Sequence, residues 1–135
     1  MDSHESQHRV HHIVSFSLND ESLNMLRSIE KAFDGRSEAI RAGLRLLEQE
    51  QQQRHALHGR LSGMLVVVHE EKRSEEIAAL RHRYRLVIRT QLHDHLDDHR
   101  CMELLILHGE AREIVALADA CAGTRDVMRA QLIVF

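Results

Sequence analysis

The sequence contains no proline and no tryptophan, and it has only one tyrosine, three phenylalanines and two cysteines. So few aromatic rings argue against an RNA-binding surface on which bases stack. Two cysteines are too few for a disulfide framework and are compatible with a reducing cytoplasm. No apolar run approaches the roughly 18 residues of a membrane span, and the first residues lack the apolar core of a signal peptide. A net charge of −3 gives no overall basic field to attract nucleic acid. We therefore expect a cytoplasmic protein without a membrane segment.

Histidine, in contrast, is abundant, with 12 residues in 135. His93 and His95 lie in a segment whose alternating pattern predicts a strand, so both side chains point to the same face. A hairpin closing through residues 96–99 would bring Cys101 next to them. Two imidazoles and a thiolate on one face form most of a transition-metal site, and His82 upstream could supply a fourth ligand. The competing interpretation is two solvent-facing histidines and a small core cysteine.

The first part of the chain predicts a short strand followed by two helices. We expect residues 1–10 to form a disordered arm and residues 11–18 to form a strand, because apolar and polar residues alternate there. Asn19 supplies an N-cap to a first helix that ends near Phe33, and Ser37 supplies an N-cap to a second helix. A single strand without a partner cannot bury a core in so short a segment. The pattern therefore favours a dimer in which two copies pair their strands.

Residues 11–50 resemble a ribbon-helix-helix DNA-binding domain (βαα, dimeric). The resemblance rests on the alternating strand at 14–18 and on the segment Arg36-Ser37-Glu38-Ala39-Ile40-Arg41. In that fold the paired strands enter the major groove, and the amides at the start of the second helix bind a phosphate. The resemblance implies DNA contacts from Arg9, Ile13, Ser15, Ser17, Arg36 and Ser37. A dimerisation module without DNA binding is the competing interpretation.

Residues 61–135 predict a second domain of order βαββαβ. A strand of unbroken apolar residues begins at Met64, and helical patterns follow over residues 71–82 and 111–121. The other strands are expected at 85–95, 100–107 and 127–135, with a turn at Gly109. This order is that of a ferredoxin-like or ACT-like sheet with both helices on one face. Polar residues 51–60 predict a linker, so the fold class is α+β with two domains. Cys121 lies on the apolar stripe of the last helix and is expected in the core.

A ribbon-helix-helix domain followed by this βαββαβ domain, with its His-x-His and Cys pattern, resembles the nickel-responsive repressor family NikR. The resemblance implies one Ni(2+) per subunit, held by His82, His93, His95 and Cys101. It also implies that the first of these histidines comes from a neighbouring subunit, in a homotetramer that is a dimer of dimers. Glu103 lies two residues beyond the cysteine on the same strand face, so we expect it to orient a ligand imidazole.

The resemblance implies a transcriptional regulator, a repressor of nickel uptake, that binds palindromic operator half-sites when metal is bound. Ile13 stands near a position where many members carry a basic residue, and residues 1–55 hold seven Lys and Arg against nine Asp and Glu. A metal-binding buffer or chaperone without DNA recognition is therefore an alternative. A sensor of cobalt, zinc or copper is another, because the same donors bind those ions. No enzyme activity is expected, since four protein ligands leave no vacant coordination position.

Overall fold

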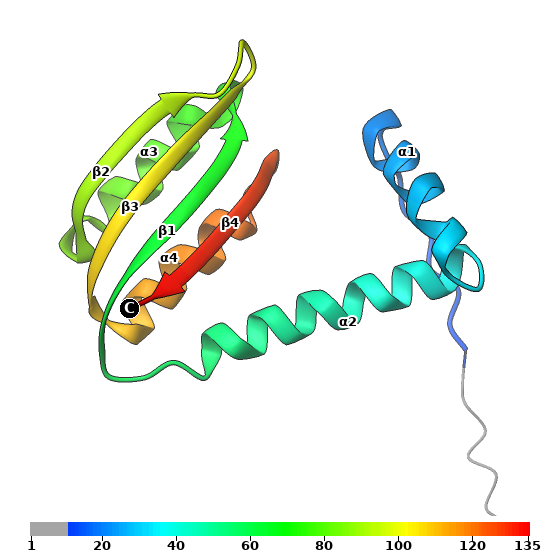
Figure 1. Cartoon of the computed structure of the whole chain (residues 1–135), viewed down its shortest axis with the longest axis horizontal. Helices are drawn as coiled ribbons and strands as arrows, with labels where there is room; N and C mark the ends of the chain where they lie inside the picture. The colour runs from blue at the N-terminus through cyan, green and yellow to red at the C-terminus, as the bar shows by residue number, and fades with distance from the viewer. Residues whose placement is uncertain (1–10) are drawn as a thin grey trace, which may run out of the picture. The chain divides into compact units, whose positions relative to one another are not determined.

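The computed structural model describes residues 11–135, which divide into two compact units, one ending at Leu44 and one running from Arg45 to Phe135. The fold is mixed α+β, with helices and one four-stranded antiparallel sheet (Figure 1). The expected arm, including Arg9, lies outside the described residues. None of the described helices is long and apolar enough to cross a membrane.

The two helices expected in the first part of the chain are present. Helix α1 spans Asp20–Ile29, a 3-10 turn spans Glu30–Ala32, and helix α2 spans Arg36–His55. Asn19 caps α1 as predicted, because its side-chain oxygen accepts a hydrogen bond from the amide of Ser22 at 2.8 Å.

Helix α2 differs from the expectation at both ends. It begins at Arg36, so Ser37 lies inside its first turn instead of capping it, and Gly35 before it has a φ of 86° that favours glycine. The helix also continues to His55, through the first half of the segment 51–60 that we expected to be a linker. Gln, Glu and Arg all have favourable helix propensities, which is sufficient to extend a helix that is already nucleated.

Residues 11–19 form no helix or strand in the single chain that the structure describes. Ile13, Val14 and Phe16 are 99, 76 and 60% exposed. A strand that pairs only with a second copy has no partner within one chain, so the expected ribbon, and with it the ribbon-helix-helix domain, stays a prediction.

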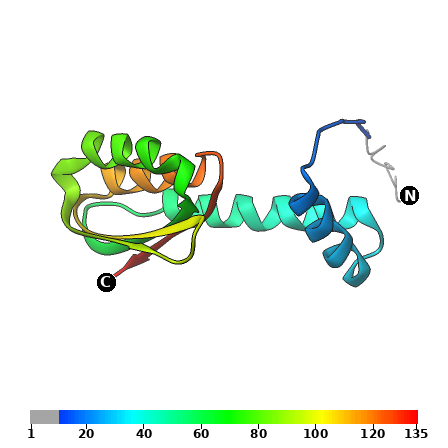
Figure 2. The same ribbon diagram turned by 90° about the horizontal axis from the view of Figure 1, so that it is seen from above.

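The second unit has the predicted order βαββαβ, and its sheet has the strand order β2-β3-β1-β4 with all neighbours antiparallel. Helices α3 and α4 lie on the same face of the sheet (Figures 1 and 2). This is the ferredoxin-like arrangement. The elements are β1 (Arg60–Glu70), α3 (Ser74–Arg83), β2 (Ile88–His95), β3 (Arg100–Glu110), α4 (Ala111–Ala122) and β4 (Val127–Val134).

Several boundaries in this unit differ from the prediction. Strand β1 begins at Arg60 and not at Met64, and α3 begins at Ser74 because Glu71–Arg73 form a 3-10 turn. Strand β2 begins three residues later than expected, because Arg85–Val87 form a 3-10 turn. Gly109 lies within β3 and does not start a turn. A Cβ at Gly109 would lie 2.7 Å from Cγ1 of Val87, so this glycine permits the close approach of that 3-10 turn to the strand.

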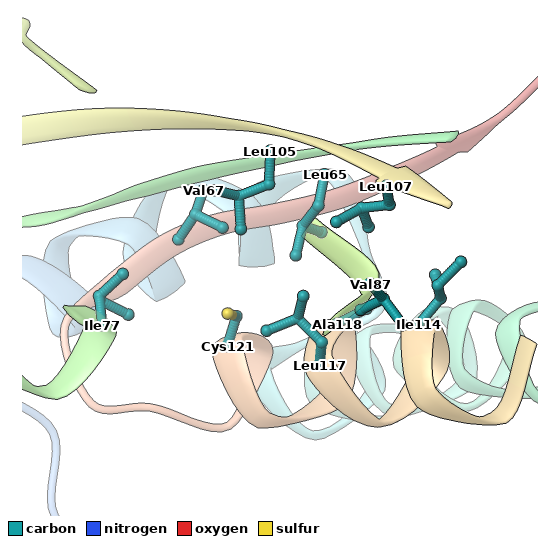
Figure 3. Close-up of a cluster of buried hydrophobic side chains, with 10 residues drawn as sticks. All are labelled: Leu65, Val67, Ile77, Val87, Leu105, Leu107, Ile114, Leu117, Ala118 and Cys121. Carbon is teal, nitrogen blue, oxygen red and sulfur yellow. The ribbon is translucent and has the colours of Figure 1, made fainter. Parts of the chain in front are cut away.

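The core lies between the sheet and its two helices (Figure 3). Alternate residues of β1 and β3 face the helices, which supply the opposing apolar side chains. Cys121 is 1% exposed within this core, as predicted, and burial raises the pKa of its thiol to about 12. The cluster consists of Leu65, Val67, Ile77, Val87, Leu105, Leu107, Ile114, Leu117, Ala118 and Cys121.

Asp119 on α4 binds the last turn of α2. Its carboxylate accepts hydrogen bonds from Arg54 Nε at 2.8 Å and from His55 Nε2 at 2.6 Å. Burial alone would raise the pKa of Asp119, but the hydrogen bonds from His55 and Arg54 outweigh it and lower the pKa below 3.8. The ionised form of Asp119 therefore stabilises the folded state.

Replacing Asp119 with Asn should lower the free energy of unfolding at pH 7 by about 1.5–3 kcal/mol, the usual contribution of a hydrogen bond to a charged group. Because the folded pKa lies below the unfolded one, this contribution is complete above the unfolded pKa of 3.8 and is lost as the pH falls through the folded value. Urea unfolding of both proteins from pH 7 to about pH 3 measures the difference. A difference that stays constant over this range would contradict the ionic origin.

Candidate metal centre

The candidate centre is built on the hairpin between β2 and β3. The antiparallel register places His95 opposite Cys101 and His93 opposite Glu103. Alternate residues of a strand share a face, and paired residues of neighbouring strands lie side by side. Cys101 and Glu103 are buried toward the helices, so all four side chains share the helix-covered face of the sheet. The hairpin that carries them joins β2 to β3 at one end of the sheet (Figure 1).

Asp97 closes the hairpin turn. Its Oδ1 accepts hydrogen bonds from the amides of His99 at 2.9 Å and Arg100 at 2.8 Å, and its Oδ2 accepts one from Arg100 Nε at 2.7 Å. The His99 amide and the Arg100 guanidinium together lower the pKa of Asp97 to about 2. Asp97 therefore stabilises the turn, and the turn determines how β2 and β3 approach the candidate centre.

Three side chains come together as a possible metal-binding group. One ligand atom from each of His93, His95 and Cys101 lies within 4.8 Å of the others. Cys101 Sγ lies 3.5 Å from His95 Nδ1, and the two imidazole rings are 5.2 Å apart at an angle of 76°. The cysteine is buried and both histidines are exposed, so the group is open on its histidine side. Two nitrogens and a sulfur in this arrangement suit a borderline-soft transition metal.

The thiol of Cys101 is neutral in the metal-free protein. Burial raises its pKa, a hydrogen bond with Ser74 opposes this, and the carboxylates of Glu71 and Glu103 raise it further. A thiolate at this position therefore needs a cation beside it, and a bound metal ion would supply one.

Glu103 lies next to His93 on the neighbouring strand. Its Oε1 accepts a hydrogen bond from His93 Nδ1 at 3.0 Å. Because a carboxylate accepts, the proton lies on Nδ1 and the lone pair of His93 Nε2 is free for a metal. Carboxylates commonly orient metal-binding histidines in this way.

Two further residues, His69 and Arg81, lie next to Glu103 and were not predicted from the sequence. His69 is fully buried; its Nδ1 donates to the carbonyl oxygen of Glu70 at 2.8 Å, and its Nε2 lies 3.7 Å from Glu103 Oε2. Arg81 on α3 places its Nε 3.5 Å from Glu103 Oε1. His69 continues the inward alternation of β1 beyond Val68, where the apolar run ends, and that alternation was the signal that could have identified it.

His82, the fourth predicted ligand, is exposed in the last turn of α3 and is not a member of the group that the described residues form. The predicted DNA-contacting residues that the structure describes belong to the first unit. Ser15, Ser17 and Ser37 are exposed, as is Ile13. The Arg36 side chain is engaged in an ion pair with Glu30, whose Oε2 lies 2.7 Å from Arg36 Nε.

The two cysteines should be unreactive in the folded, metal-free protein. Both are buried, and burial raises the pKa of each thiol. A colorimetric thiol reagent should therefore react slowly under native conditions and titrate two thiols rapidly in guanidinium chloride. Rapid reaction of one thiol in the folded protein would show that Cys101 is more accessible than the structure indicates.

Comparison with known proteins gives consistent matches. The NikR C terminal nickel binding domain family matches residues 62–135. Three similar proteins carry the name "Putative nickel-responsive regulator". The one from Methanococcus aeolicus is 31% identical over 124 residues, which is 88% of each chain. The one from Caldanaerobacter subterraneus is 31% identical over 128 residues, 90% of this chain and 82% of its own.

The third, from Desulfovibrio desulfuricans, is 37% identical over 101 residues, 70% of this chain and 72% of its own. Among solved structures, the uncharacterized protein TM1266 from Thermotoga maritima superposes with a TM-score of 0.53 at 19% identity. It covers 57% of this chain and 99% of its own, and at this identity the match concerns the fold alone.

Proposed function

The chain belongs to the NikR family of nickel-responsive regulators, and from this membership we propose that it binds operator DNA when nickel occupies a site on its second unit. The observation that supports the site most strongly is the convergence of His93, His95 and Cys101, with Glu103 already oriented behind His93. We propose one Ni(2+) per subunit in a cytoplasmic transcriptional regulator that represses nickel uptake.

His82 is the fourth ligand in this proposal, and a neighbouring subunit contributes it. Its exposed position at the end of α3 leaves the imidazole accessible to a second chain. A bound metal would supply bonds between side chains of two subunits. Three imidazoles and a thiolate suit planar Ni(II) but also Cu(II), and they can hold Zn(II) tetrahedrally. Competition between these ions therefore tests the alternative that the protein senses another metal.

A homotetramer, a dimer of dimers, fits the surface of the second unit. The sheet face opposite helices α3 and α4 carries a continuous set of apolar side chains that are only partly buried. Patches of this kind on a folded domain are typical of subunit interfaces. The set comprises Met64, Val66, Val68, Met102, Leu104 and Ile106.

The pattern of exposed side chains in the first unit supports the proposal of a dimeric DNA-binding domain. The exposed side chains of Val14, Phe16 and Leu18 alternate with polar ones, so pairing with a second copy would bury one face of the strand and leave the other outward. In this proposal Ile13, Ser15 and Ser17 face the DNA bases.

The phosphate contact of this proposal lies at the start of α2. The first amides of a helix have no partner within the helix and carry its positive end, so those near Arg36 and Ser37 suit a backbone phosphate. Arg9 completes the proposed set of contacts to palindromic half-sites. Metal binding would favour DNA binding through a coupling free energy of about 1–3 kcal/mol.

The proposal predicts DNA binding that requires nickel and is reversed by a chelator. Fluorescence anisotropy of operator fragments from upstream of the protein's own and neighbouring genes measures it, with stoichiometric nickel and then with chelator. Replacing His82 or Cys101 with Ala should abolish the response, because each removes a donor. His99→Ala is the matched control, since His99 lies in the same hairpin outside the ligand group, and it should respond like the wild type.

A retained nickel response in the His82 or Cys101 variant would reject the site. Tight nickel binding with no DNA binding in either state would instead favour a metal buffer, the function that Ile13 and the acidic balance of residues 1–55 leave open.

A further inference from the structure

Glu103 is a buried carboxylate with one permanent positive charge beside it. Only 2% of Glu103 is exposed, and its Oε1 faces both His93 Nδ1 at 3.0 Å and Arg81 Nε at 3.5 Å. His69 faces the other oxygen, Oε2, at 3.7 Å without a hydrogen bond. A buried carboxylate is costly unless a cation compensates its charge, and of these three neighbours only a guanidinium is always charged.

The guanidinium of Arg81 faces Glu103, but its Nε makes no hydrogen bond within residues 11–135. The side chain is 23% exposed, and its buried Nε has no hydrogen-bond partner among the described residues. A distance of 3.5 Å between Nε and Oε1 is an ion pair that has not tightened into a hydrogen bond. A small shift of Glu103 or of the end of α3 would close this gap.

Arg81 directly precedes His82 in the last turn of α3. Arg81 turns inward to Glu103 of its own sheet, while His82 is exposed. The end of α3 therefore carries two side chains with different partners. Arg81 contacts Glu103 of its own subunit, and His82 is proposed to bind the metal of a neighbouring subunit.

We propose that Arg81 is a positioning residue of the metal centre, which holds the Glu103 carboxylate against His93 and ties the end of α3, with His82, to the centre of its own subunit. This inference rests on the proposed function. His93 then keeps its Nδ1 hydrogen bond and presents Nε2 outward, so the loss of Arg81 should weaken metal binding without removing a ligand. The nickel sites of neighbouring subunits should also become less dependent on one another.

Nickel titration of the full-length protein tests this inference through the nickel–thiolate absorption band, with a chelator as competitor. Arg81→Met should lower the nickel affinity about tenfold or more, the usual effect of losing an outer partner of a ligand, and should shift the band. Arg81→Lys should restore part of the affinity, since it keeps the charge. Arg83→Met is the matched control, because Arg83 flanks His82 on the other side and packs on the Tyr84 ring, 5.5 Å from its centroid; it should behave like the wild type.

A double-mutant cycle with Glu103→Gln separates positioning from a general effect on α3. If Arg81 acts through Glu103, adding Arg81→Met to Glu103→Gln should cause little further loss of nickel affinity. Wild-type nickel affinity and band position in Arg81→Met, or fully additive losses in the double variant, would overturn the inference while leaving the metal site intact. A wild-type protein without a nickel–thiolate band would reject the proposed function itself, and this inference with it.

Discussion

The antiparallel register between β2 and β3 is the constraint on which the candidate metal centre depends. Two successive pairs on one face, His95 with Cys101 and His93 with Glu103, place two imidazoles, a thiol and a carboxylate together. A slip of one residue would turn both histidines to the opposite face of the sheet. The hydrogen bonds of Asp97 to the backbone of the turn oppose such a slip, because they define where the hairpin reverses.

Strands β1 and β3 carry the apolar core at one end and surround the candidate centre at the other. Leu65 and Leu105 face the helices at the apolar end, whereas His69, Cys101 and Glu103 continue that inward face at the other. At this polar end His69 Nε2 and Glu103 Oε2 are buried without hydrogen bonds. An unsatisfied buried polar atom costs roughly 1–3 kcal/mol, so this end of the sheet is the less stable one in the metal-free chain.

Local pattern was sufficient to predict the order of the elements, the core role of Cys121 and the meeting of His93, His95 and Cys101, because strand alternation, the apolar stripe of a helix and a short hairpin are all visible in local sequence. The position of Glu103 on the same strand face as Cys101 was predicted in the same way. His69 and Arg81 were missed because their contacts with Glu103 depend on the pairing of β1 with β3 and on the packing of α3. The alternation of β1 predicts only that His69 faces inward, and it does not predict this contact. Gly109 was misplaced for a similar reason, since glycine marks both turns and close approaches.

Three features of the described part of the chain have no partner within a single copy. The strand predicted at residues 11–18 has no second strand, the apolar face of the sheet is only partly buried, and His82 is exposed away from the ligand group. Under the proposed function a second copy of the chain supplies the missing partner in all three cases, so metal binding requires assembly. The link between them within a subunit is short: His82 follows Arg81, Arg81 faces Glu103, and Glu103 holds His93. If the proposed function holds, the contact that orients His93 also fixes the helix end that carries His82 to the neighbouring chain, and metal binding is thereby coupled to assembly.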